Sequence, residues 1–188
     1  MQALLGSLLL FFALPYWEAN PPEKWSLREI ELLRVSSPWA QTVGPEPRVL
    51  AYLATAAPIE QAERELRVRS RNAMREPDPD YLTYLSQNRD THFVLAVTYP
   101  ERARLGKAEE ERRLENETVM RVGGKDYPIS GHFPPTPSDP VLRLIFPREV
   151  RTTDKRVVFR LYLPGINFPD RELEFTVKDL MYRGKLEM

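Results

Sequence analysis

Apolar and polar residues alternate along the C-terminal third of the chain. An apolar residue recurs at every second position of 156–163 and again from Leu173 to Val177. Such alternation gives a strand one buried and one solvated face, which is typical of antiparallel sheet. Residues 91–99 are apolar almost throughout, which predicts a central strand that is covered on both faces. Shorter apolar runs predict four more strands, at residues 47–54, 118–122, 125–130 and 141–146.

The pair Gly123-Gly124 lies between two of these strands and predicts a tight hairpin, because glycine adopts the positive φ of a two-residue turn without strain. Such a turn places Met120 opposite Tyr127. Pro128 indicates that the second strand lies at a sheet edge, since proline lacks the N–H that a further strand would need. An edge hairpin presents free backbone groups. We therefore expect Met120 and Tyr127 to contact a partner.

Helical signals are concentrated in the first two-thirds of the chain. Ser26 and Glu29 have the spacing of a capping box, which predicts that a helix begins directly after Ser26. This helix should end near Ser36, because Pro38 disfavours helical geometry in the residue before it. Further helices or helical turns are predicted at residues 58–73, 81–86 and 101–117, the last of them strongly charged and exposed.

These elements predict an α+β fold with about seven strands and two or three helices in the N-terminal two-thirds. The architecture should be mainly an antiparallel sheet or a two-sheet sandwich with helices packed on it, all in one domain. Trp25 and Trp39 bracket the first helix, and we expect both to pack it onto the body. An exposed aromatic pair used for recognition is the alternative.

The N-terminal segment resembles an export signal. Residues Ala3–Leu14 are largely apolar and uncharged, which fits the core of a signal peptide and is too short for a spanning helix of about 20 residues. We expect residues 1–22 to be a signal peptide or an uncleaved anchor, and residues 23–188 to be the domain. The signal is atypical because no basic residue precedes it, and because cleavage after Ala19 would place bulky Trp17 close to the cut. A buried N-terminal helix is the alternative.

Composition narrows the function classes. The 27 basic and 27 acidic residues cancel, so no net charge attracts the chain to nucleic acid or to an anionic membrane. The absence of cysteine excludes disulfides, thiolate metal sites, a cysteine nucleophile and the lipid-modified cysteine of a lipoprotein. With two histidines and no phosphate-binding glycine motif, we expect neither a metal site nor a cofactor.

His92 is the one weak candidate for catalysis. It follows Asp90 closely, and a histidine oriented by an aspartate is a common general base. No nucleophile is linked to it in the sequence, and Asp90 is also typical of a turn. A hydrolase of unfamiliar design that uses His92 is therefore an alternative function, and we do not expect it.

Four arginines recur on one face of the helix predicted at residues 58–73, and they would suit an anion or a nucleic acid. Glu60 and Glu63 neutralise part of this face, so a merely solvated surface is the competing interpretation. The four residues are Arg64, Arg67, Arg71 and Arg75, of which only Arg71 and Arg75 lack an acidic neighbour.

Two stretches resemble a family of exported bacterial proteins that has no known activity. Residues 25–40 contain the pattern W-S-x-x-E-I-x-x-L-x-x-x-S-P-W-A, and the stretch FTVKDLMYRGKLE begins at Phe175. In that family the first pattern follows a signal peptide, and the second lies near the C-terminal end. The resemblance implies export to the periplasm or the cell exterior, and it implies no functional residues.

The sequence thus predicts a non-enzymatic exported protein of the bacterial envelope with a binding or assembly role. Its partner should be an envelope protein or a small ligand, and nucleic acid is not expected. Membrane contact is expected only through the N-terminal segment. The alternatives are the hydrolase that uses His92 and an anion or nucleic-acid binder that uses the arginine face.

Overall fold

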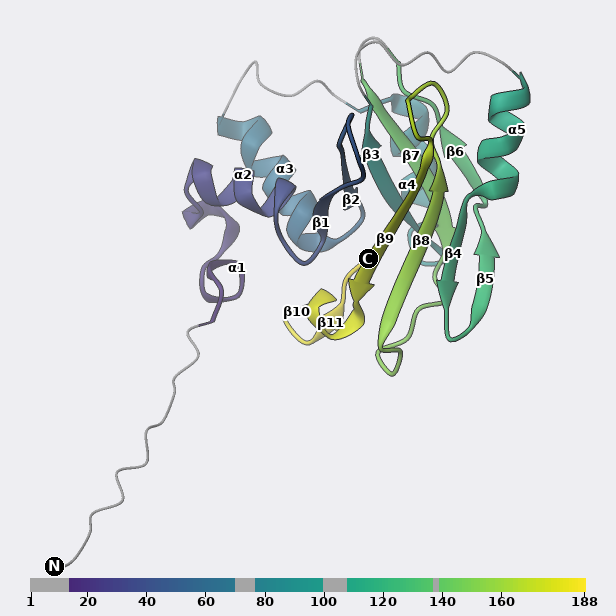
Figure 1. The fold of residues 1–188 in the computed structure, drawn as a ribbon. Coiled ribbons are helices and arrows are strands. Elements are labelled where there is room, and N and C mark those ends of the chain that lie inside the picture. The colour runs from purple at the N-terminus through teal and green to yellow at the C-terminus, as the bar shows by residue number, and fades with distance from the viewer. Residues whose placement is uncertain (1–13, 70–76, 100–107, 137–138) are drawn as a thin grey trace, which may run out of the picture.

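The structure is a computed structural model that describes residues 14–69, 77–99, 108–136 and 139–188. Within these ranges it contains five α-helices and eleven strands, and all the strand pairs are antiparallel. The fold is therefore α+β, as the sequence predicts, and the helices lie mainly in the N-terminal two-thirds. Two sheets face each other, and Figure 1 shows β8 and β9 crossing in front of β3 and β7.

The first sheet, sheet A, has five strands, and its two inner strands carry the most apolar sequences. Its order is β1 (Ala40–Val43), β2 (Val49–Leu53), β3 (His92–Thr98), β7 (Val141–Pro147) and β6 (Gly131–Phe133). The five middle residues of β3 and of β7 are all buried. The continuous apolar run at 91–99 therefore forms a central strand covered on both faces, as predicted.

The second sheet, sheet B, contains the predicted hairpin and the two alternating strands. Its order is β5 (Lys125–Pro128), β4 (Val119–Val122), β8 (Arg156–Tyr162) and β9 (Asp170–Thr176). The hairpin turn has φ values of 57° at Gly123 and 78° at Gly124, a region that only glycine adopts freely. Strand β5, which ends at Pro128, lies at the sheet edge, and Met120 pairs with Tyr127; both predictions are confirmed.

Four phenylalanines join the two sheets at the centre of the sandwich. Phe93 and Phe146 pair across sheet A with ring centroids 5.8 Å apart. Phe159 of sheet B packs edge-on against Phe146 at 5.1 Å, and Phe175 follows at 5.9 Å. Since alternate residues of a strand face opposite sides, the odd-numbered residues of β3 point towards sheet B and the even-numbered ones point away from it.

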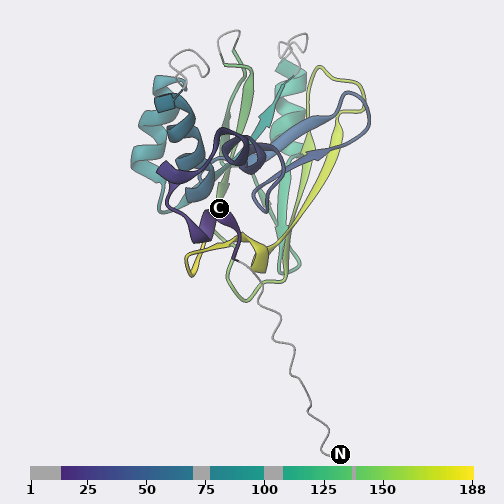
Figure 2. The same ribbon diagram turned by 90° about the vertical axis from the view of Figure 1, so that its left-hand side faces the viewer.

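Helices cover the outer face of sheet A and one end of sheet B. Figure 2 shows α3 and α4 on one flank of the molecule and α5 on the other. The helix α2 begins at the predicted capping box, in which the Glu29 N–H donates to Ser26 Oγ and the Ser26 N–H donates to Glu29 Oε2 at 2.6 Å. The helices are α1 (Tyr16–Ala19), α2 (Leu27–Val35), α3 (Ala57–Arg69), α4 (Pro79–Asn88) and α5 (Ala108–Glu117), and short 3₁₀ turns lie at Pro22–Lys24 and Val177–Leu180.

Several boundaries differ from the prediction. Strands β1 and β6 were not among the predicted strands. Both are short strands at the edges of sheet A, too short to show a periodicity. The small hairpin of β10 (Met181–Tyr182) and β11 (Lys185–Leu186) closes the chain. Helix α4 is longer than the short turn expected at residues 81–86, and its first turn is capped by the Asp78 side chain.

The segment before α2 packs on the domain. The Tyr16 hydroxyl donates to the Glu29 carbonyl at 2.6 Å, and burial raises the pKa of Tyr16 to about 12. Trp17 packs edge-on against Trp39 at 6.0 Å. Trp25 and Trp39 are both buried, so these two tryptophans pack α2 onto the body as expected and do not form an exposed recognition pair.

Candidate functional site

His92 lies at the start of β3, on the outer face of sheet A. Its Nδ1 is 2.9 Å from Thr91 Oγ1, and its ring packs edge-on against Tyr84 at 6.2 Å. The side chain is half-buried and lines neither of the two hollows described below. Thr91 and Tyr84 are thus the side chains that the structure places against His92.

The predicted hairpin forms, but it does not present Met120. The Met120 side chain is 0% exposed and packs between the sheets, because directly paired residues point to the same face and its partner Phe159 packs against Phe146 of sheet A. The expectation that a partner contacts Met120 is therefore corrected: its side chain is out of reach while the sandwich is closed. Tyr127 is half-buried at the edge strand.

The structure describes two of the four arginines of the predicted face, and these two differ in exposure. Arg64 is exposed, whereas Arg67 is half-buried and its Nη1 atom is buried without a hydrogen-bond partner. Glu60, which was expected to neutralise part of this face, pairs with Arg89 at 2.6 Å, and the helix forms a Glu65–Arg69 pair at 2.7 Å. Arg71 and Arg75 lie outside the described residues.

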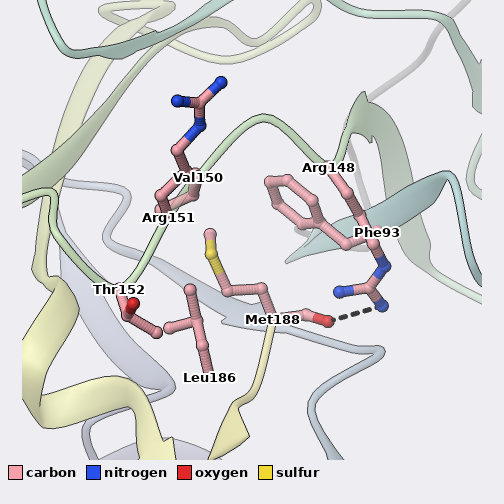
Figure 3. A pocket seen from close by; sticks show the side chains of 7 residues that line it. All are labelled: Phe93, Arg148, Val150, Arg151, Thr152, Leu186 and Met188. Atoms are coloured by element: carbon pink, nitrogen blue, oxygen red, sulfur yellow. Dashed lines mark hydrogen bonds between the residues drawn. The ribbon is translucent and has the colours of Figure 1, made fainter.

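One candidate site is a hollow at one end of the sandwich, with a volume of about 390 Å³. We call it the end hollow. Three segments far apart in the sequence form it: the start of β3, the connection from β7 to β8, and the chain after β10. Its lining residues are Phe93, Arg148, Val150, Arg151, Thr152, Leu186 and Met188 (Figure 3).

Hydrogen bonds hold two of these segments in place. The β7–β8 connection is tied by the Arg151 N–H, which donates to Asp154 Oδ2 at 2.7 Å, and by the Asp154 N–H, which donates back to the Arg151 carbonyl at 2.9 Å. The last residues are held by the Trp39 indole N–H, which donates to the Glu187 carbonyl at 3.1 Å. The hollow is therefore largely preformed, as binding pockets usually are.

The floor of the end hollow is apolar and its margin is basic. In Figure 3 the side chains of Phe93, Leu186 and Met188 gather around the space, while the Arg151 guanidinium extends away from Leu186 and Met188. The Arg148 guanidinium donates to the Met188 main-chain oxygen at 3.1 Å and to the Arg89 carbonyl at 2.7 Å. An apolar space beside cationic groups suits a molecule that is apolar at one end and negatively charged at the other.

Burial lowers the pKa of Arg148, and the nearby Glu187 partly offsets this effect. An arginine remains protonated at neutral pH even when its pKa falls. The two hydrogen bonds of Arg148 go to main-chain oxygens, those of Arg89 and Met188, and no Asp or Glu side chain among the described residues forms an ion pair with it.

A second hollow of about 470 Å³ lies where α5 meets the end of sheet B. Its lining is strongly polar and carries charges of both signs, with Glu117, Arg160, Asp170 and Glu172 among its residues. Arg160 already pairs with Asp126 at 2.9 Å, and Glu117 with Arg113 at 2.7 Å. Arg171 lines it as well, so acidic and basic side chains are mixed around this second hollow, and it offers no apolar floor.

None of the lining residues of the end hollow was a sequence-predicted site residue. Phe93 looks like any core residue of a central strand, and the β7–β8 connection carries no recognisable motif. The hollow exists only after three distant segments have folded together, so no local sequence pattern predicts it. Within the described ranges, no group of three or more His, Asp or Glu side chains is arranged to hold a metal ion.

No helix in the described part of the chain combines the length and apolar character needed to cross a membrane. No protein-family model matches this chain, and neither a curated protein nor a solved structure matches it.

Proposed function

We propose that this chain is an exported, non-enzymatic protein of the bacterial envelope that binds a small amphipathic ligand in the end hollow. The observation that carries the proposal is the apolar floor of Phe93, Leu186 and Met188 beside the positive charges of Arg148 and Arg151. The apolar part of the ligand enters the floor, and its anionic group lies near the two arginines.

The chemistry of the hollow favours binding over catalysis. Its polar side chains are those of Arg148, Arg151 and Thr152, and none of these is paired with a general base in the described structure. A fixed cation beside an apolar space orients and retains an amphipathic acid without reacting with it. His92, the residue on which the hydrolase alternative depends, is not among the lining residues.

Packing of the leading residues supports retention of the N-terminal segment. Cleavage after Ala19 would remove Tyr16 and Trp17, which contact the domain, and Glu18, whose carboxylate accepts the Arg183 N–H at 2.9 Å. We therefore favour the uncleaved anchor over the signal peptide. The resemblance of residues 25–40 to exported bacterial proteins supports the same localisation.

Calorimetric titration with two matched probes tests the binding site. Octanoate and octanol share an apolar chain, and only octanoate carries a negative charge. We expect octanoate to bind and Val150→Trp to abolish binding by filling the hollow, whereas Leu82→Trp, at an exposed position on α4, should leave it unchanged. Arg151→Gln should weaken octanoate binding by about tenfold and leave octanol binding unchanged.

Two results would overturn this proposal. One is the absence of a binding heat for octanoate at concentrations of about 10 mM. The other is equal octanoate binding by Val150→Trp and the unsubstituted chain, because a tryptophan side chain in the hollow leaves no room for the ligand.

A further inference from the structure

A row of residues crosses the helix-covered face of sheet A at its centre. Tyr52 of β2 pairs with Ala96 of β3, and Ala96 pairs with Arg143 of β7. Directly paired residues of an antiparallel sheet point to the same face. Ala96 therefore separates a tyrosine from an arginine on this face, and all three residues are buried.

Three helices bring further charged and polar side chains to this row. Tyr81 of α4 is 5% exposed, and the Arg143 guanidinium lies over its ring, 4.4 Å from the centroid. Glu63 of α3 lies near Arg34 of α2, Arg67 of α3 and Arg143, whose charges lower its pKa while burial raises it. We call the set of Arg34, Tyr52, Glu63, Arg67, Tyr81 and Arg143 the arginine cluster.

The charges of the arginine cluster do not cancel. Arg143 is neutralised by Asp139 at 2.7 Å, and Glu60, the other acid near Glu63, is neutralised by Arg89 at 2.6 Å. Two arginines, Arg34 and Arg67, then remain beside one acid, Glu63. Neither forms a direct ion pair with it in the described structure. The cluster therefore carries an excess of one positive charge while Glu63 is ionised.

Arg67 has a donor that nothing in the described structure satisfies. Its Nη1 is one of two buried side-chain nitrogen or oxygen atoms without a hydrogen-bond partner there. A buried donor left without an acceptor is costly, and a buried guanidinium is more so. A cluster that served only to join the helices to the sheet would bring Glu63 into contact with Arg67. In the observed arrangement no described acceptor, Glu63 included, bonds this nitrogen.

We propose that the arginine cluster is a binding site for a small oxyanion of the phosphate type, held by Arg34 and Arg67 against the face of sheet A. The guanidinium fork presents paired N–H donors that match the oxygens of a phosphate or sulfate group. Tyr52 and Tyr81 belong to the same cluster. Burial raises the pKa values of both hydroxyls and keeps them protonated, so they add no negative charge.

Glu63 makes this site dependent on pH. Burial raises the pKa of Glu63 above its ordinary value, although the three arginines lower it in part. Protonation of Glu63 removes the one unpaired negative charge of the cluster, so anion affinity should rise as the pH falls through the pKa of Glu63. The other groups that face it, Asp139 and Glu60, are held by their arginine partners.

Titration calorimetry of the whole chain with inorganic sulfate and inorganic phosphate tests the site. Arg67→Gln should weaken binding of both ions by about tenfold or more, whereas Arg64→Gln, an equal charge change at an exposed position of the same helix, should change it by less than about twofold. Arg67→Lys keeps the charge and removes the fork, so it should give an intermediate affinity. Far-UV circular dichroism verifies that each variant is folded.

Sulfate also isolates the role of Glu63, because its charge is constant across the pH range in which a carboxyl titrates. Sulfate affinity should fall as the pH rises, and Glu63→Gln should bind sulfate about tenfold more tightly at neutral pH and show no such dependence. Titration with phenyl phosphate distinguishes a phosphorylated ligand, which would bind more tightly than phosphate, from the free ion.

Two outcomes would overturn the inference. One is equal weakening by Arg67→Gln and Arg64→Gln, since a general charge effect rather than a site would then account for binding. The other is no detectable binding of sulfate or phosphate at about 10 mM by the folded chain. The end hollow does not enter this test, so either proposal can fail alone.

Discussion

The packing of the segment before α2 gives a quantitative prediction. A chain that begins at residue 20 lacks α1, and with it two edge-on aromatic contacts to the domain, Tyr16 with Trp25 at 6.1 Å and Trp17 with Trp39 at 6.0 Å. Each such pair contributes about 1 kcal/mol, and the hydrogen bond from the Tyr16 hydroxyl contributes about as much. Removal of α1 should therefore lower the free energy of unfolding by about 3 kcal/mol.

The control is a chain that begins at residue 14, which lacks the apolar run but keeps α1. Thermal unfolding followed by circular dichroism should show the chain from residue 20 melting roughly 6–12 °C below the control, since each kcal/mol corresponds to about 2–4 °C for a chain of this size. Equal melting temperatures would refute the reasoning. They would show that α1 does not stabilise the domain, and cleavage at Ala19 would then be compatible with a stable product.

Three further predictions follow from the fold. Phe159→Ala should lower the free energy of unfolding by about 3–5 kcal/mol in urea denaturation, because its ring contacts phenylalanines of both sheets; a loss below about 1 kcal/mol would contradict the sandwich core. Ser26→Ala removes one half of the capping box and should cost about 1 kcal/mol by the same assay, whereas an unchanged midpoint would mean that α2 does not depend on its cap. Because the pKa of Glu63 is raised above its ordinary value of 4.5, the folded state binds more protons than the unfolded state between these two values, so stability should fall as the pH rises through that window. In Glu63→Gln this component of the pH dependence should disappear, and a curve that is identical to the unsubstituted chain would contradict it.

The sequence determined the elements whose signals are local. The alternation in β8 and β9, the glycine pair of the β4–β5 hairpin and the capping box of α2 each depend on residues close together in the chain, and all three appear where they were predicted. The α+β class follows from these elements. The short edge strands β1 and β6 were missed because three or four residues carry no measurable period, and their pairing depends on longer strands beside them.

Only the tertiary structure decided which side chains meet. The end hollow joins Phe93 to residues more than fifty positions later, and the arginine cluster draws on α2, β2, α3, α4 and β7. Helical periodicity placed Arg64 and Arg67 on one face of α3, yet the packing of α3 on sheet A left Arg64 exposed and partly buried Arg67. Periodicity fixes the direction of a side chain relative to its own element, and contact with a distant element is fixed only when the elements pack together.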